Sequence, residues 1–83
     1  MSNKLTVNIG FGNSVVKSDI TAVIQPNSAP IKRLIKRKQE EGVLIDATMG
    51  KKLRAVIPLR SGYIALSAIS PAALISRIES EDE

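Results

Sequence analysis

Apolar and polar residues alternate in several short runs of the chain, each bounded by glycine, proline, asparagine or serine. Residues 4–9 (KLTVNI) and 19–25 (DITAVIQ) show the period of two that is typical of a β-strand with one buried face. Similar runs follow at residues 43–48, 53–59 and 63–69. The pattern predicts five strands, and Pro58, which cannot donate to a sheet ladder, places the fourth near a sheet edge.

Two segments show helical spacing instead. In the first, Ile31, Leu34 and Ile35 form an apolar stripe at i, i+3 and i+4. Ser28 or Ala29 is the expected cap, Pro30 suits the first turn, and Gly42 is a natural residue just past the end. The sequence therefore predicts a helix that ends near residue 41.

A second helix is expected at the C-terminal end. Ser70 is its predicted cap, and Pro71 suits its first turn. Its apolar face is predicted to contain Ala72, Leu74, Ile75 and Ile78. The element order ββαβββα predicts a single α+β domain with a small antiparallel or mixed sheet and two helices.

Several predicted strands carry apolar residues on their nominal outer face as well, namely Val23, Leu44 and Val56. A small sheet with two apolar faces must cover both of them. One helix can cover the first face. Either a partner subunit or the second helix of the same chain can cover the other.

The charge is uneven along the chain. All twelve basic residues but only four of the eight acidic ones lie within residues 1–78, which gives this part a net charge of +8. The other four acidic residues lie in 79–83. We therefore predict a basic domain over residues 1–78, suited to a polyanionic partner, followed by an acidic tail at 79–83.

The composition argues against several function classes. The chain has no Cys and no His, which excludes disulfides and removes the usual zinc ligands and the commonest general base. The acidic residues before the tail, Asp19, Glu40, Glu41 and Asp46, are not grouped as a catalytic pair. We therefore expect no enzyme, no cofactor and no metal site.

The start of the chain, MSNKLTVNIG, lacks the apolar core of a signal peptide, and no apolar run approaches the ~18 residues of a membrane span. A cytoplasmic protein without a membrane partner is expected. The segment GFGN (10–13) looks superficially like a phosphate loop. It lacks the third glycine and the following helix of a dinucleotide fingerprint, so a tight turn between strands is the better interpretation.

Two basic segments are candidates for phosphate contact. In the first helix, Lys32 and Lys36 lie one turn apart, as do Arg33 and Arg37, so each pair projects to one side. Such a face can contact the phosphates of a duplex, or it can simply be the solvated side of an amphipathic helix. An anionic membrane is a weaker match, because the apolar side has no Trp or Phe.

The second candidate is GKKLR (50–54), predicted to form the tip of a hairpin. Lys51, Lys52 and Arg54 place three cations on one protrusion, which suits a grip on phosphates or a groove. Lysines at a hairpin tip can also protect a sheet edge from aggregation. Phe11 and Tyr63 are the only aromatic residues, so the chain has no platform for stacking single-stranded bases. Duplex DNA is therefore favoured over RNA.

Four segments resemble a known family in order and spacing: NIGFGN (8–13), SAPIKR (28–33), LIDATMGKKLRAVI (44–57) and LSAISP (66–71). The chain resembles the RemA family of bacterial extracellular matrix regulatory proteins over about residues 5–78. The resemblance implies a DNA-binding transcriptional regulator, known in spore-forming bacteria for activating biofilm matrix genes. It also implies a fold similar to LytTR-type DNA-binding domains and assembly into rings, with DNA along the basic rim.

The family's paired basic residues fall on Lys51 and Lys52, with Arg54 following. Family members typically have Arg-Arg there, and Lys keeps the charge but loses the bidentate fork. Asp19 stands where members often carry Arg, and Lys17 is the candidate substitute.

Together these features predict a nucleoid-associated, ring-forming protein that binds duplex DNA. The predicted contact residues are Lys51, Lys52, Arg54, Lys32, Arg33, Lys36 and Lys17. The alternatives are an assembly protein whose basic surface binds an acidic protein or membrane, and an RNA-binding module.

Overall fold

The computed structural model describes residues 5–80 and contains two helices and two small sheets. The α+β class predicted from the sequence is confirmed. The elements are β1 (Thr6–Gly10), β2 (Asn13–Val16), the 3₁₀ turn η1 (Lys17–Asp19), α1 (Ala29–Glu41), β3 (Leu44–Ala47), β4 (Ala55–Pro58), β5 (Ile64–Ser67) and α2 (Pro71–Glu79).

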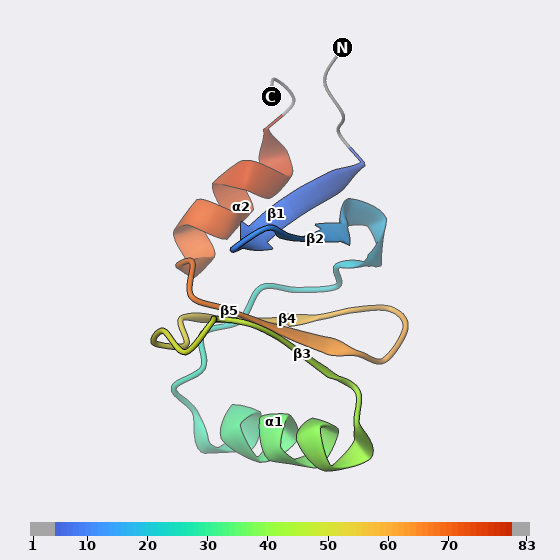
Figure 1. The fold of residues 1–83 in the computed structure, drawn as a ribbon, viewed down its shortest axis with the longest axis vertical. Coiled ribbons are helices and arrows are strands. Elements are labelled where there is room, and N and C mark those ends of the chain that lie inside the picture. The colour runs from blue at the N-terminus through green and yellow to red at the C-terminus, as the bar shows by residue number, and fades with distance from the viewer. Residues whose placement is uncertain (1–4, 81–83) are drawn as a thin grey trace.

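The middle layer is a three-stranded mixed sheet in which β5 is the central strand (Figure 1). All four residues of β5 are buried, as expected for a strand with a neighbour on each side. β3 pairs with β5 in parallel and β4 pairs with it antiparallel, so Ala47 and Ala55 both lie beside Ser67. The predicted hairpin between β3 and β4 is therefore wrong, because β5 separates the two strands. The chain between them is a loop that passes the end of β5.

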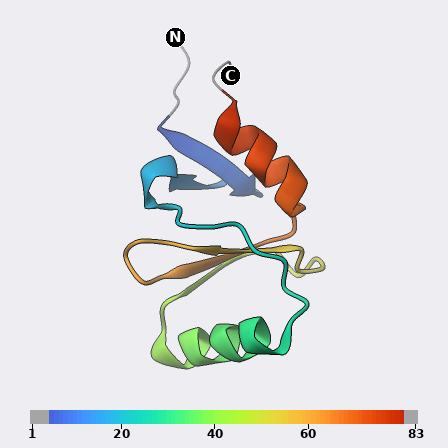
Figure 2. The same cartoon turned by 180° about the vertical axis from the view of Figure 1, so that it is seen from behind.

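Both faces of this sheet are covered within the chain (Figures 1 and 2). On one face, Val56 and Leu66 pack with Ile31, Leu34 and Ile35 of α1. The opposite face is covered by the other layer, in which Val7 and Ile9 of β1 and Leu74 of α2 join Ala55, Ile57, Leu59 and Ala65. The apolar outer face of the strands is thus explained by intrachain packing, and no partner subunit is needed to cover it.

The first two strands form an antiparallel hairpin, β1–β2, beside α2. The second predicted strand, residues 19–25, is misplaced. Those residues make only two isolated bridges to the edge of β4, from Ile20 to Leu59 and from Ile24 to Val56. Ile20 packs on the side of the sheet that β1 and α2 cover, whereas Ile24 packs on the side that α1 covers. The segment therefore crosses the sheet edge from one side to the other.

Both helices begin at the predicted caps. The side-chain oxygen of Ser28 accepts a hydrogen bond from the Ile31 N–H, and that of Ser70 from the Ala73 N–H, each at 3.3 Å. The predicted apolar face of α2 is only partly buried. Leu74 and Ile78 pack inward, whereas Ala72 and Ile75 are exposed.

Two predicted segments at the chain ends lie partly outside the described residues. Lys4, in the first predicted strand, and residues 81–83 of the acidic tail lie outside 5–80. Glu79, which the sequence assigned to the tail, is the last residue of α2.

The Ser67 side chain connects the three-stranded sheet to the layer formed by β1, β2 and α2. Its hydroxyl, fully buried, donates to the carbonyl oxygen of Ile9 at 2.7 Å and accepts from the N–H of Ile69 at 3.0 Å. One hydroxyl thus satisfies an acceptor in the hairpin and a donor in the chain that leads to α2. A buried polar group without a partner costs about 1–3 kcal/mol, so removal of this hydroxyl should lower the stability of the fold.

We expect Ser67→Ala to lower the free energy of unfolding by about 2 kcal/mol, because it leaves two backbone groups without their hydrogen bonds. Chemical denaturation measures this change. Ser76→Ala is the matched control, since Ser76 is exposed on α2, and its effect should stay within about 0.5 kcal/mol. Equal stability of the two variants would show that the Ser67 bonds contribute little.

Candidate nucleic-acid interface

The segment from Thr48 to Arg54, here called the basic loop, connects β3 to β4 across the end of β5. The carboxylate of Asp46 anchors its start by accepting from the Thr48 hydroxyl at 2.6 Å and from the Thr48 N–H at 2.9 Å. These two bonds, with the hydroxyl bond the larger influence, hold the pKa of Asp46 below its ordinary value. The loop is therefore tied to the sheet where it leaves β3.

A tight turn follows this anchor. The N–H of Lys51 donates to the carbonyl oxygen of Thr48 at 2.9 Å, and the two central residues, Met49 and Gly50, have φ values of 52° and 79°. Positive φ at both central positions is the signature of a type I′ turn. Gly adopts this conformation freely, whereas a non-glycine residue is strained there by about 1 kcal/mol.

The three cations of the basic loop are exposed to solvent. Lys51, Lys52 and Arg54 all have exposed side chains, while Leu53 points inward against the α1 layer. The backbone N–H of Arg54 donates to the carbonyl oxygen of Ser67 at 2.9 Å, which fixes the far end of the loop. The cations thus project from a loop whose two ends are both hydrogen-bonded to the sheet.

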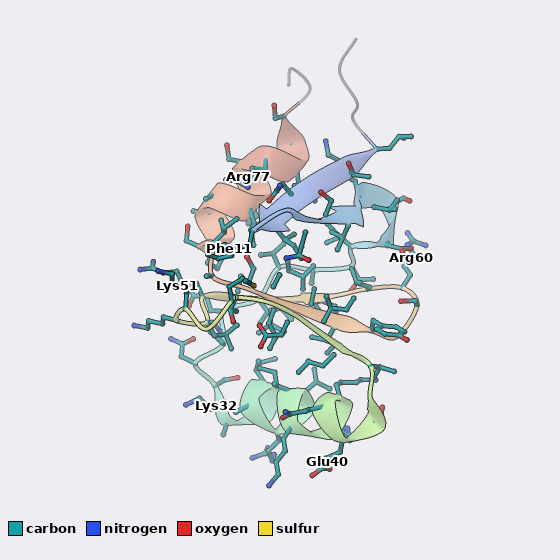
Figure 3. The ribbon with its side chains drawn as sticks, in the orientation of Figure 1. Phe11, Lys32, Glu40, Lys51, Arg60 and Arg77 are labelled. Atoms are coloured by element: carbon teal, nitrogen blue, oxygen red, sulfur yellow. The ribbon has the colours of Figure 1, made fainter. Side chains whose placement is uncertain are left out.

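The tip of the β1–β2 hairpin, residues 10–13, lies beside this loop and is here called the aromatic turn (Figure 3). It also has positive φ at both central residues, 53° at Phe11 and 81° at Gly12. Phe11 and Met49 are the two non-glycine residues with positive φ among residues 5–80. Both side chains are apolar and exposed, although Asn, Asp or Gly is the usual choice at such a position.

The basic loop borders two hollows. One, of about 430 Å³, is lined by residues of the loop, of the aromatic turn and of the chain after β5: Gly10, Phe11, Lys51, Lys52, Arg54, Ala68 and Ile69. The other, of about 360 Å³, reaches the start of α2 and the turn before α1: Gln25, Pro26, Asn27, Lys52, Leu53, Arg54, Ser70 and Pro71. Lys52 and Arg54 therefore stand between two concave surfaces.

Both helices begin on this side of the molecule (Figure 1). The N-terminus of a helix carries a partial positive charge and free N–H groups, which favour anions. The three loop cations and the two helix starts therefore give one edge of the domain a concentrated positive potential.

The predicted contacts on α1 divide into two groups. Lys32, near the start of the helix, lies on the same side as Lys51 in Figure 3. Arg33 and Lys36 are exposed, and the helix face that packs on the sheet is formed by other residues. Lys32 of α1 thus lies at the same edge as Lys51, Lys52 and Arg54, here called the basic edge. Arg33 and Lys36 lie on the solvent-facing side of α1, next to this edge.

Lys17 does not join this edge. Its ammonium group donates to the carbonyl oxygen of Ser80 at 3.3 Å, at the C-terminal end of α2. That end is about 13 Å from the helix start by the helical rise. The carbonyl oxygen of Asp19, the last residue of η1, accepts from the N–H of Arg60, on the opposite side of the sheet from Lys51. The structure therefore places Lys17 away from Lys51 and Lys52, where its charge complements a helix C-terminus.

Two negative findings concern the described part of the chain. Within residues 5–80, no group of three acidic, His or Cys side chains could hold a metal ion. In the same range, no helix is long and apolar enough to cross a membrane.

Comparison with known proteins places the chain in a family. Residues 6–78 match the RemA-like family, described as Extracellular matrix regulatory protein A-like. The chain belongs to the RemA-like family. The resemblance inferred from the four sequence segments is thereby confirmed.

Relatives of similar length support a regulatory role. A protein of Dictyoglomus thermophilum is 54% identical over 77 residues, which cover 93% of this chain and 91% of the relative. One of Alkaliphilus metalliredigens is 51% identical over 76 residues, covering 92% of this chain and 82% of the relative. One of Clostridium novyi is 48% identical over 83 residues, covering 100% and 91%. All three bear the description "Putative regulatory protein".

Sequence reasoning missed two features of this RemA-like domain. The sequence does not predict that Phe11 lies beside the three cations of the basic loop, or that the Asp46 carboxylate accepts from Thr48. The dipeptides Phe11-Gly12 and Met49-Gly50 held a signal for the first, because an apolar residue is unusual at a turn position that demands positive φ.

Replacement of Thr48 by Val should raise the pKa of Asp46 toward its ordinary value, because the hydroxyl bond is lost while the backbone bond remains. The folded-state pKa of Asp46 is depressed, so its stabilising contribution is present above the unfolded pKa and disappears as the pH falls through the folded pKa. The loss still begins near the unfolded pKa, which the substitution does not change. Thr48→Val should therefore make the part of the acid-side loss of stability that comes from Asp46 smaller, and complete at a higher pH.

A carboxyl-carbon NMR titration of Asp46 measures this shift directly. Thr21→Val is the control, because the Thr21 hydroxyl donates to the carbonyl oxygen of Pro58, remote from Asp46. An unchanged Asp46 titration in Thr48→Val would mean that the backbone bond alone sets the pKa.

Proposed function

We propose that this RemA-like protein is a DNA-binding transcriptional regulator that acts as a ring-like homo-oligomer and binds duplex DNA along a basic rim. The observation that carries the proposal is the convergence at one edge of Lys51, Lys52, Arg54 and Lys32 with the starts of both helices. Phosphate groups supply most of the affinity in protein–DNA complexes, and such an edge suits them.

The proposed contact is chiefly to phosphates. A lysine ammonium is a point charge and lacks the planar fork with which arginine reads a guanine edge. Arg54 retains that fork, beside the two lysines. The sequence preference is therefore proposed to come from Arg54 and from the ease with which a DNA sequence deforms.

Assembly would multiply a weak contact. Four cations on one protomer bind DNA weakly at physiological salt, whereas a ring presents the same edge repeatedly to one duplex and gains affinity through effective concentration. Since both sheet faces are covered within the chain, the subunit contacts are proposed to use exposed apolar side chains outside the sheet. Leu5, Val16 and Ile75 are such side chains.

The remaining parts of the proposal follow from this role. A regulator of this kind acts in the cytoplasm, associated with the nucleoid, and needs neither catalysis nor a cofactor. The alternatives were an acidic protein, an anionic membrane or single-stranded RNA as partner. Each gives a distinct result in the experiment below.

Fluorescence anisotropy of a labelled mixed-sequence duplex, titrated with protein at several salt concentrations, tests the proposal. We expect binding whose logarithm falls linearly with the logarithm of salt, with a slope of about −0.9 per phosphate neutralised. Lys51→Glu/Lys52→Glu should abolish binding, and Lys51→Ala/Lys52→Ala should weaken it and flatten the slope. Circular dichroism and light scattering verify that each variant folds and assembles as the wild type does.

The matched control is Lys17→Ala/Arg60→Ala, which removes the same charge from the opposite edge and should leave most of the affinity intact. Equal losses in the two double alanine variants would show that net charge, not the basic edge, drives binding. No binding by folded, assembled wild type at low salt would refute the DNA proposal. Tighter binding to single-stranded RNA or to anionic vesicles would favour one of the alternatives.

A further inference from the structure

The ring of Phe11 is exposed at a position where the local chain chemistry favours a polar residue. Its exposed fraction is 56%, whereas Val7 and Ile9 of the preceding strand are buried. Its φ of 53° is one that Asn or Gly adopts more readily. Residues with a strained backbone are concentrated at functional sites. A strained residue with an exposed apolar side chain is therefore a candidate contact for a ligand.

The backbone around Phe11 is held firmly. The side-chain oxygen of Asn8 accepts from the N–H of Gly10 at 2.7 Å. The side-chain amide of Asn13 donates to the carbonyl oxygens of Gly10 and Phe11 at 3.0 and 3.4 Å. The carbonyl oxygen of Ile9, two residues before Phe11, accepts a hydrogen bond from the buried Ser67 hydroxyl. The ring is therefore presented on a pre-organised turn.

The surroundings of the ring indicate what it meets. Phe11 shares the hollow of about 430 Å³ with the cations Lys51, Lys52 and Arg54, and Ala68 and Ile69 complete its lining. In a DNA duplex, an aromatic ring can contact the faces of stacked bases, and cations next to it can contact the phosphates on either side. Proteins that bend DNA insert Phe or another apolar side chain between two base pairs while cations hold the backbone nearby.

On these grounds we propose that Phe11 is a wedge that partly unstacks a base step of bound duplex DNA while Lys51, Lys52 and Arg54 hold the adjacent phosphates. The inference rests on the proposed function and adds a residue and a mechanism to it. Unstacking is easiest at pyrimidine–purine steps, so Phe11 biases binding toward DNA that contains TA or CA steps. The wedge thus supplies sequence preference without reading a base edge.

Permanganate oxidation of thymines tests the wedge, because the reagent attacks thymines that are unstacked and the position of the step need not be known beforehand. The probe is a labelled duplex with TA steps at several positions, saturated with each protein variant. Phe11→Asn removes the ring while suiting the left-handed backbone, and Phe11→Gly is a second ring-free variant. Phe11→Tyr keeps the ring, and Tyr63→Ala removes an exposed aromatic from the loop between β4 and β5.

We expect wild type, Phe11→Tyr and Tyr63→Ala to make particular thymines reactive. Phe11→Asn and Phe11→Gly should lose this reactivity and bind the duplex roughly tenfold more weakly, with unchanged assembly mass. Unreactive thymines in a salt-sensitive wild-type complex would overturn the wedge and leave the proposed function standing. A changed assembly mass in both ring-free variants would assign Phe11 to a subunit contact and also overturn it. Failure of the wild type to bind DNA would refute the proposed function itself.

Discussion

The Ser67 side chain links the three-stranded sheet to the β1–β2 hairpin and to the chain before α2. It lies at the end of the central strand and bonds to β1 on one side and to the chain before α2 on the other, while the Ser67 carbonyl accepts from Arg54. One residue therefore fixes the hairpin, the basic loop and the approach to α2 relative to one another. Ser67 thus bonds the strand before the aromatic turn and the end of the basic loop to the same end of β5.

Two turns of the same unusual kind flank the cations. Phe11-Gly12 and Met49-Gly50 both have positive φ at both central positions, and each places an apolar side chain in solvent. Each departs from the residues that would make the turn most stable. Such departures are expected where a surface is shaped for contact and not for stability alone. Their common location at the edge that carries Lys51 links the strain to the proposed DNA contact.

The strand order explains how the basic loop is held against the sheet. In the predicted hairpin, the lysines would lie at the tip of a two-stranded protrusion. In the observed sheet, β5 lies between β3 and β4, so the basic loop crosses the end of the central strand and is bonded to it at Arg54. In the proposed DNA complex, a loop backbone held at both ends has less conformational freedom to lose, which favours binding by a surface with few charges.

Local patterns in the sequence predict the α+β class, both helices with their serine caps, the strands β1, β3, β4 and β5, and exposed cations at Lys51, Lys52 and Arg54. Period and capping are local properties, so they can be read from neighbouring residues. Three features follow only from the packing of distant segments. Residues 19–25 cross the sheet edge, Lys17 lies beside the end of α2, and Phe11 lies beside the basic loop. These outcomes depend on which strand lies at the centre of the sheet and on the Ser67 bond to Ile9, between residues 58 positions apart. No local pattern encodes a contact over that separation.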